Sequence, residues 1–171
     1  MSNTKRGFTL IELLVVIAII GVLASVVLAS LNTARSKGAD AAIKANLNGI
    51  RAQAELYYDG TGANTYGATA FAEATCASNA TGNILADTNV KAAINSANTS
   101  AGGTITTNAY TLTRCGVSTT SWAIATTLKS DTTDAWCIDS SGNSKLVATA
   151  ASDALTVLGT GTSADPFLCG A

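Results

Sequence analysis

The hydrophobic pattern divides the chain into two very different parts. Residues 8–28 are apolar at almost every position and carry one charged side chain, Glu12. A helix of this length spans about 30 Å at 1.5 Å per residue, which is the thickness of the hydrocarbon core of a membrane. The pattern therefore predicts a helix that is apolar on all sides and long enough to cross a membrane.

The residues before this segment indicate its orientation. Residues 1–7 contain Lys5 and Arg6 and no acidic residue. Positive residues beside a membrane helix favour the cytoplasmic side, so the bulk of the chain is expected outside. Two ordinary alternatives stay open, namely a cleaved secretory signal with a small-residue site near Ala29 and a simple single-span anchor.

The spacing of apolar residues predicts that the helix continues to about residue 58. Ile43, Leu47, Ile50, Ala54 and Tyr57 recur every three or four residues and so share one face. We expect this amphipathic half, residues 29–58, to pack against the rest of the chain. The charged residues on the other side are expected to form a solvated face; they are Arg35, Lys37, Asp40, Lys44, Arg51 and Glu55.

The remainder, residues 59–171, has the pattern of a small globular part. A loop-rich stretch to about residue 108 contains one short predicted helix at residues 84–98, with Asp87 as its N-cap. Strands are predicted at residues 110–115, 121–128, 135–139 and 145–149, with a turn at 140–143. Short connections favour an antiparallel sheet of three or four strands that lies against the long helix, an α+β fold.

Composition excludes several functional classes. The 171 residues include no histidine, and the formal net charge is −1. The first fact excludes His-based acid–base catalysis and most zinc enzymes, and the second argues against specific nucleic-acid binding. Asp153 and Asp165 flank a stretch rich in glycine and threonine, but their spacing fits no tight calcium loop. We therefore expect no enzyme, no cofactor and no metal site.

The four cysteines predict disulfides. Cys76, Cys115, Cys137 and Cys169 do not have the spacing of a metal-binding motif. Disulfides persist outside the cytoplasmic membrane, and four cysteines allow three pairings. We favour Cys115–Cys137, because the strands that carry them could be neighbours, together with Cys76–Cys169.

Glu12 is the feature that a cleaved signal or a simple anchor does not explain. An acidic residue at the centre of a membrane helix costs about 2.5–3.5 kcal/mol, with a lower cost near the edge, and such a group needs a cationic partner. Residues 8–28 contain no lysine or arginine. The partner must therefore come from elsewhere.

The N-terminal sequence resembles the processing and assembly region of type IV prepilins and pseudopilins. The resemblance rests on a short basic leader ending at Gly7, on Phe8 directly after it, on Glu12 as the fifth residue after Gly7, and on the apolar helix. It implies a pilin-like fold. It also implies cleavage after Gly7 by a membrane prepilin peptidase, N-methylation of Phe8, and pairing of Glu12 with the Phe8 amine of a neighbouring subunit.

The resemblance further implies a structural subunit of an extracellular filament, a helical homopolymer for adhesion, motility or DNA uptake. The subunit would lie in the inner membrane before assembly by a membrane platform with its own ATPase. One alternative is a pseudopilin of a type II secretion system, and another is a monomeric envelope binding domain with a simple anchor or cleaved signal. The expected divisions are a leader at 1–7, a membrane half at 8–28, an amphipathic half at 29–58 and the globular part at 59–171.

Overall fold

A computed structural model of the chain describes residues 7–67, 71–73, 76, 81–106, 109–148, 158 and 167–170. The chain divides into two compact units, Met1–Ser36 and Lys37–Ala171. The long helix α1, Leu10–Asp59, contributes to both units and confirms the helix predicted from residue 8 to residue 58. We call the part of α1 before Lys37 the stem, and the second unit the head.

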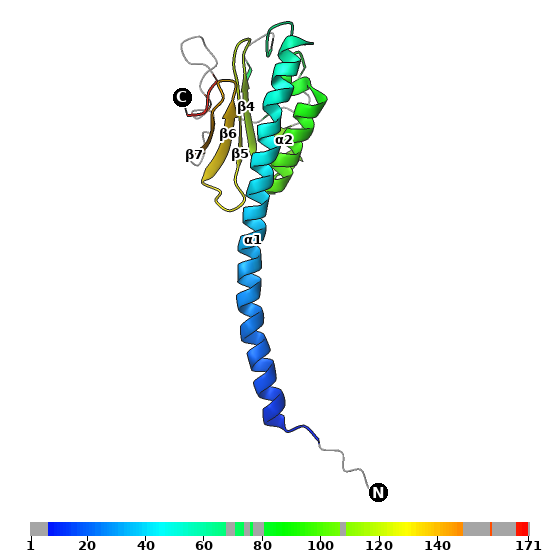
Figure 1. The fold of residues 1–171 in the computed structure, drawn as a ribbon, viewed down its shortest axis with the longest axis vertical. Coiled ribbons are helices and arrows are strands. Elements are labelled where there is room, and N and C mark those ends of the chain that lie inside the picture. The colour runs from blue at the N-terminus through cyan, green and yellow to red at the C-terminus, as the bar shows by residue number, and fades with distance from the viewer. Residues whose placement is uncertain are drawn as a thin grey trace. The chain divides into compact units, whose positions relative to one another are not determined.

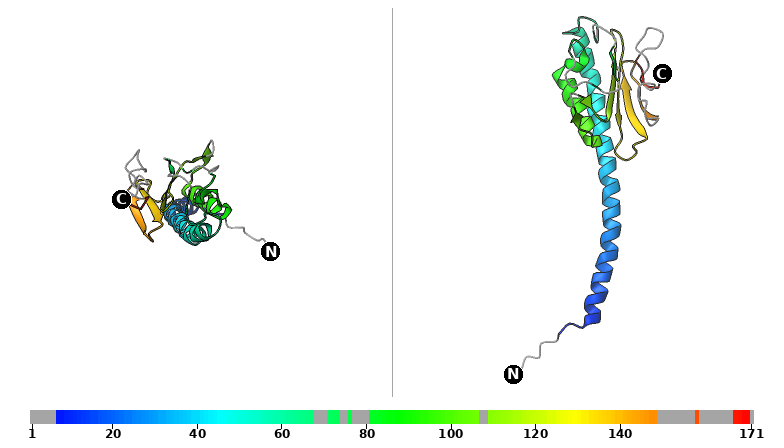
Figure 2. Two further views of the ribbon diagram at one scale, coloured as in Figure 1. Left: turned by 90° about the horizontal axis from the view of Figure 1, so that it is seen from above. Right: turned by 180° about the vertical axis from the view of Figure 1, so that it is seen from behind.

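The head places helices on one face of an antiparallel sheet (Figures 1 and 2). Ile43, Leu47, Ile50 and Ala54 of α1 are completely buried in the core, as their spacing predicted. This core also contains apolar residues of the second helix, α2 (Thr88–Ala101), and of the sheet strands. The predicted α+β fold, a long helix packed on a small antiparallel sheet, is therefore confirmed.

The sheet is larger than the pattern predicted. It has five antiparallel strands in the order β1-β4-β5-β6-β7. The strands are β1 Phe71–Glu73, β4 Thr113–Val117, β5 Trp122–Thr127, β6 Asp134–Asp139 and β7 Ser144–Ala148. A separate ribbon pairs β2, Ile105–Thr106, with β3, Ala109–Tyr110. Strand β1 was predicted as loop, because three residues are too few to show the two-residue alternation of a strand.

The helix predicted near residue 84 begins a little later. A short 3₁₀ turn, Ile84–Ala86, precedes α2, which spans Thr88–Ala101. The predicted N-cap is confirmed, since Asp87 Oδ1 accepts hydrogen bonds from the backbone N–H groups of Asn89 at 2.8 Å and Val90 at 3.0 Å.

The cysteines form disulfides, but the favoured pairing is wrong. Cys76 is bonded to Cys115 and Cys137 to Cys169. Strand β5 lies between β4 and β6, so Cys115 and Cys137 are two strands apart, roughly 10 Å. Cys115 is also level with Ile138, the neighbour of Cys137, so the two cysteines point to opposite faces of the sheet. A disulfide requires the Cα atoms to lie within about 7 Å.

The other face of the sheet is covered by residues close to the C-terminus of the chain. Phe167 and Cys169 are buried there with Ala123, Ala125 and Cys137. Phe167 lies over Gly116 of β4, where a side-chain Cβ would come within 2.3 Å of the Phe167 ring. A glycine at this position therefore allows the phenyl ring to contact the sheet backbone directly.

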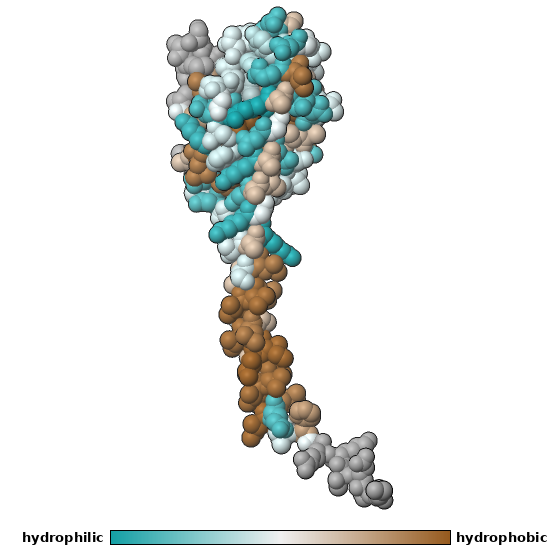
Figure 3. Space-filling view, in the orientation of Figure 1, coloured by the Kyte–Doolittle hydropathy of each residue, from teal (hydrophilic) through white to brown (hydrophobic). Residues whose placement is uncertain are grey.

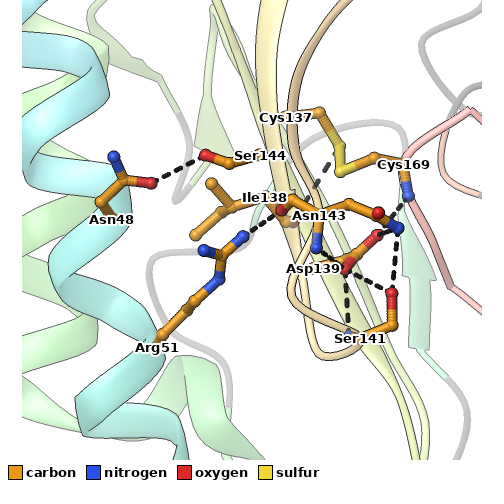
Figure 4. The surroundings of a disulfide bond; sticks show 9 residues. All are labelled: Asn48, Arg51, Cys137, Ile138, Asp139, Ser141, Asn143, Ser144 and Cys169. Atoms are coloured by element: carbon orange, nitrogen blue, oxygen red, sulfur yellow. Dashed lines mark hydrogen bonds between the residues drawn. A yellow bond between two sulfur atoms is a disulfide. The ribbon is translucent and has the colours of Figure 1, made fainter.

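Asp139, at the end of β6, connects the predicted β6–β7 turn to the C-terminal segment (Figure 4). The residue is fully buried. Its Oδ1 accepts hydrogen bonds from Ser141 N–H, Ser141 Oγ–H and Asn143 N–H. Its Oδ2 accepts from the side-chain amide of Asn143 and from Cys169 N–H. One carboxylate thus fixes both the turn and the residue that forms the second disulfide.

The charged side of α1 in the head is less solvated than we expected. Asp40 is only 8% exposed, and its carboxylate accepts hydrogen bonds from the backbone N–H groups of Lys129 and Ser130. Lys44 lies over the ring of Trp136, with 4.6 Å from Nζ to the ring centre. Arg51 donates to the backbone carbonyl of Asn143 (Figure 4). These side chains attach α1 to the β5–β6 connection, to strand β6 and to the β6–β7 turn. Their spacing along the helix did not indicate these contacts.

Candidate assembly site

Glu12 lies in the first turn of α1 and is held by Thr9. Its Oε2 accepts hydrogen bonds from the Thr9 backbone N–H at 2.8 Å and from the Thr9 hydroxyl at 2.7 Å. The Glu12 backbone N–H donates to Thr9 Oγ1 at 3.2 Å. This reciprocal arrangement is a capping box, which satisfies N–H groups that the first helical turn leaves without partners.

Thr9 is the site residue that our interpretation of the sequence missed. The pattern Thr-x-x-Glu at residues 9–12, directly before an apolar run, is the sequence signal of a capping box. Only Glu12 was identified from the sequence, because it is the one charged residue in the apolar segment. In the structure the Glu12 side chain also caps the first turn of the helix.

Gly7 and Phe8 precede the helix. Both residues are non-helical and exposed, and the Phe8 side chain is 88% exposed. A Cβ built on Gly7 meets no atom within 4 Å among the described residues. The peptide bond between Gly7 and Phe8 therefore lies in an exposed, non-helical segment directly before the helix that carries Glu12.

The stem exposes large apolar side chains along its length. The exposed large apolar residues from Leu10 to Leu31 have 43–77% of their surface accessible to solvent. Figure 3 shows apolar side chains over the visible face of this segment. Within the described residues, α1 is the helix long and apolar enough to cross a membrane, by length and composition. So much exposed apolar surface in water is unfavourable, so the stem requires either lipid or other protein around it.

The described residues contain no group of three or more His, Cys, Asp or Glu that could hold a metal ion. Asp153 and Asp165, the oxygen donors considered from the sequence, lie outside the residues that the structure describes.

Comparison with known proteins finds two short similarities. Residues 2–28 match the family described as the prokaryotic N-terminal methylation motif. The type IV wide pilus major component PilA4 of Thermus thermophilus is 49% identical over 57 residues, which make up 33% of this chain and 43% of that protein. The match thus spans less than half of the relative. No solved structure matches the chain.

Proposed function

We propose, from the place of this chain in the type IV prepilin family, that it is the structural subunit of an extracellular pilus-like filament. The observation that carries the proposal is the methylation motif at residues 2–28 joined to a stem whose apolar residues are exposed. The Thermus relative is a major component of a wide pilus, which favours a pilus over a secretion pseudopilus.

In this proposal a prepilin peptidase cuts after Gly7, and the new amino terminus at Phe8 is methylated. The amine then supplies the cation that residues 8–28 lack. An incoming subunit would place this amine beside Glu12 of a neighbour, where opposite charges attract strongly in a medium of low dielectric constant. An unpaired charge there is penalised, so the pair fixes the register of assembly more surely than it adds stability.

The capping box gives Glu12 a second role before assembly. Oε2 is occupied by Thr9, whereas Oε1 accepts no hydrogen bond from the described residues. Because Thr9 holds the carboxylate at the start of the helix, Oε1 is available to an amine that arrives there. The positive end of the helix dipole also favours a carboxylate at this position.

The other partners follow from the same role. The membrane surrounds the stem before assembly, and other copies surround it in the filament. An inner-membrane platform with its ATPase would do the mechanical work, since no phosphate-binding Gly-Lys-Ser/Thr motif is present in the sequence. The protein is a structural component in this proposal and not an enzyme.

The first test is the intact mass of protein sheared from the cell surface. A chain that begins at Phe8, with one added methyl group and four hydrogens fewer for two disulfides, supports the proposal. A Gly7→Val variant is the matched control and should accumulate as the uncut precursor. A chain that begins near Ser30 would instead indicate a secreted envelope domain, and the proposal would be wrong.

A further inference from the structure

A short polar stretch of α1, residues 32–39, lies between two parts of the helix that have different surroundings. Before it stands Leu31, the last large exposed apolar residue of the stem, and after it stands Asp40, the first buried residue of α1. The boundary between the two compact units, after Ser36, falls inside this stretch. At 1.5 Å per residue its eight residues span about 12 Å. We call residues 32–39 the bridge segment.

The bridge segment is open to water. Six of its eight residues are exposed, and the other two, Ser36 and Ala39, are half-buried. The apolar helix before it requires lipid or protein around it, and in lipid an open backbone hydrogen bond is strongly penalised. The helix after it is held by four completely buried side chains of the head core. Water can therefore replace helical hydrogen bonds more readily in the bridge segment than on either side of it.

The sequence of the bridge segment favours a helix only weakly. Half of its residues have clearly lower helix propensity than alanine; they are Asn32, Thr33, Ser36 and Gly38. The Thr33 hydroxyl donates to the Ala29 carbonyl at 3.3 Å, a contact that often bends a helix. Serine and glycine are also common at helix kinks. The weakest helix formers thus stand where neither an apolar surrounding nor the head core supports the helix.

Gly38 is not required by the fold of the described residues. Its φ is not positive, and a Cβ built on it meets no atom within 4 Å. Alanine at this position would favour the helix by about fivefold, which is the difference in helix propensity between the two residues expressed as an equilibrium constant. Gly49 is equally open and helical, but its neighbours Leu47 and Ile50 are completely buried. The two glycines therefore differ in whether the helix around them is held by the core.

We propose that the bridge segment is a flexible joint in α1, at which the helix opens in water and the head turns relative to the stem. Gly38 raises the population of the open form. The proposal rests on the proposed filament function, because that function moves one subunit from a membrane to a filament. The joint lets the head change direction without loss of its core contacts and without an open hydrogen bond in lipid.

Distances between two spin labels on the full chain in lipid nanodiscs test the joint. All four cysteines form disulfides, so Val22→Cys in the stem and Asn95→Cys on α2, both at exposed sites, can be labelled alone. This pair should give a broad distribution of distances, whereas Ala45→Cys with Asn95→Cys, within the head, should give a narrow one. Gly38→Ala should lower the ratio of bent to straight chains by about fivefold. Gly49→Ala is the matched control and should leave both distributions unchanged.

A displaced glycine distinguishes flexibility from a contact that needs Gly38 itself. Ala34 is exposed and lies about one helical turn before Gly38. Gly38→Ala should lower the yield of sheared filaments, relative to membrane precursor, by about fivefold if assembly proceeds through the bent form. The double variant Ala34→Gly/Gly38→Ala should restore both the broad distribution and the yield. A double variant with a broad distribution and a low yield would overturn the use of the joint in assembly.

The outcomes separate the two proposals. The distances are measured on the unassembled chain, so a narrow distribution for the natural joint overturns the joint whether or not filaments form. Equal distributions for the natural joint and for Gly38→Ala would also overturn it. If the joint bends as expected but the natural sequence forms no filament, the proposed function is wrong and the joint stands.

Discussion

Asp139→Asn is the sharpest test of how the head is held together. An asparagine oxygen in the Oδ1 position keeps the three hydrogen bonds from Ser141 and Asn143. Its amide group then faces two donors, the Asn143 side chain and Cys169 N–H, which were 2.8 and 2.9 Å from Oδ2. Cys169 N–H is buried, and a buried donor left without a partner costs about 1–3 kcal/mol, whereas the exposed Asn143 side chain keeps its hydrogen bond to Ser141. We therefore expect a loss of about 1–3 kcal/mol in the free energy of unfolding.

The assay is urea unfolding of the detergent-solubilised chain, followed by tryptophan fluorescence. Both tryptophans of the sequence, Trp122 and Trp136, lie in the head. Asp131→Asn is the matched control, because Asp131 is an exposed carboxylate that also accepts local hydrogen bonds. The control should change the free energy by less than about 0.5 kcal/mol. If Asp139→Asn changes it as little, the carboxylate does not stabilise the head as we argue.

The pH dependence of the free energy of unfolding tests the same prediction in a second way. Burial raises the pKa of Asp139, but hydrogen bonds from Cys169, Asn143 and Ser141 outweigh it and hold the pKa below its ordinary value. A carboxylate with a lowered pKa stabilises the fold fully above its unfolded pKa of about 3.9, and this contribution is lost as the pH falls through the folded pKa. The stability gap between the natural chain and Asp139→Asn should therefore narrow below about pH 4. A gap that is constant from pH 7 to pH 3 would refute the argument.

Three further changes test other parts of the molecule. Gly116→Ala should lower the free energy of unfolding by about 1–3 kcal/mol, measured by urea unfolding, because its Cβ would come within 2.3 Å of the Phe167 ring. Replacing Cys137 and Cys169 together by serine should cost about 4 kcal/mol in the chain-entropy model, since the disulfide closes a separation of 32 residues; an unchanged urea midpoint would contradict this. Glu12→Leu should still insert into the membrane but form fewer filaments, and a normal yield of sheared filaments would count against charge pairing in assembly.

The parts of the fold that could be predicted are those with a long repeated pattern. The apolar run and the spacing of Ile43, Leu47 and Ile50 predicted α1 to within two residues at its start and one at its end. Asp87 directly before an apolar period predicted the cap of α2. These signals are local, because each depends only on residues within a few helical turns along the sequence.

The parts that could not be predicted depend on contacts between distant residues. The disulfide pairing follows from strand order, and strand order depends on β1, which is too short to leave a pattern. The role of Asp40 likewise depends on the β5–β6 connection, which is 89 residues further along the chain. In the candidate site, Gly7, Phe8 and Glu12 were visible as a motif, whereas Thr9 was overlooked although its signal was local.

Salt should leave the stability of the head nearly unchanged. The carboxylates of Asp40 and Asp139 are buried and accept short hydrogen bonds from backbone N–H groups, which salt screens little. The Debye length falls from about 10 Å at 0.1 M to about 3 Å at 1 M salt, so interactions between exposed charges weaken over this range whereas these buried hydrogen bonds do not. The urea midpoint of the unassembled chain should therefore stay nearly constant between these concentrations. A midpoint that falls steeply would show that exposed charges, and not the two buried carboxylates, hold the head together.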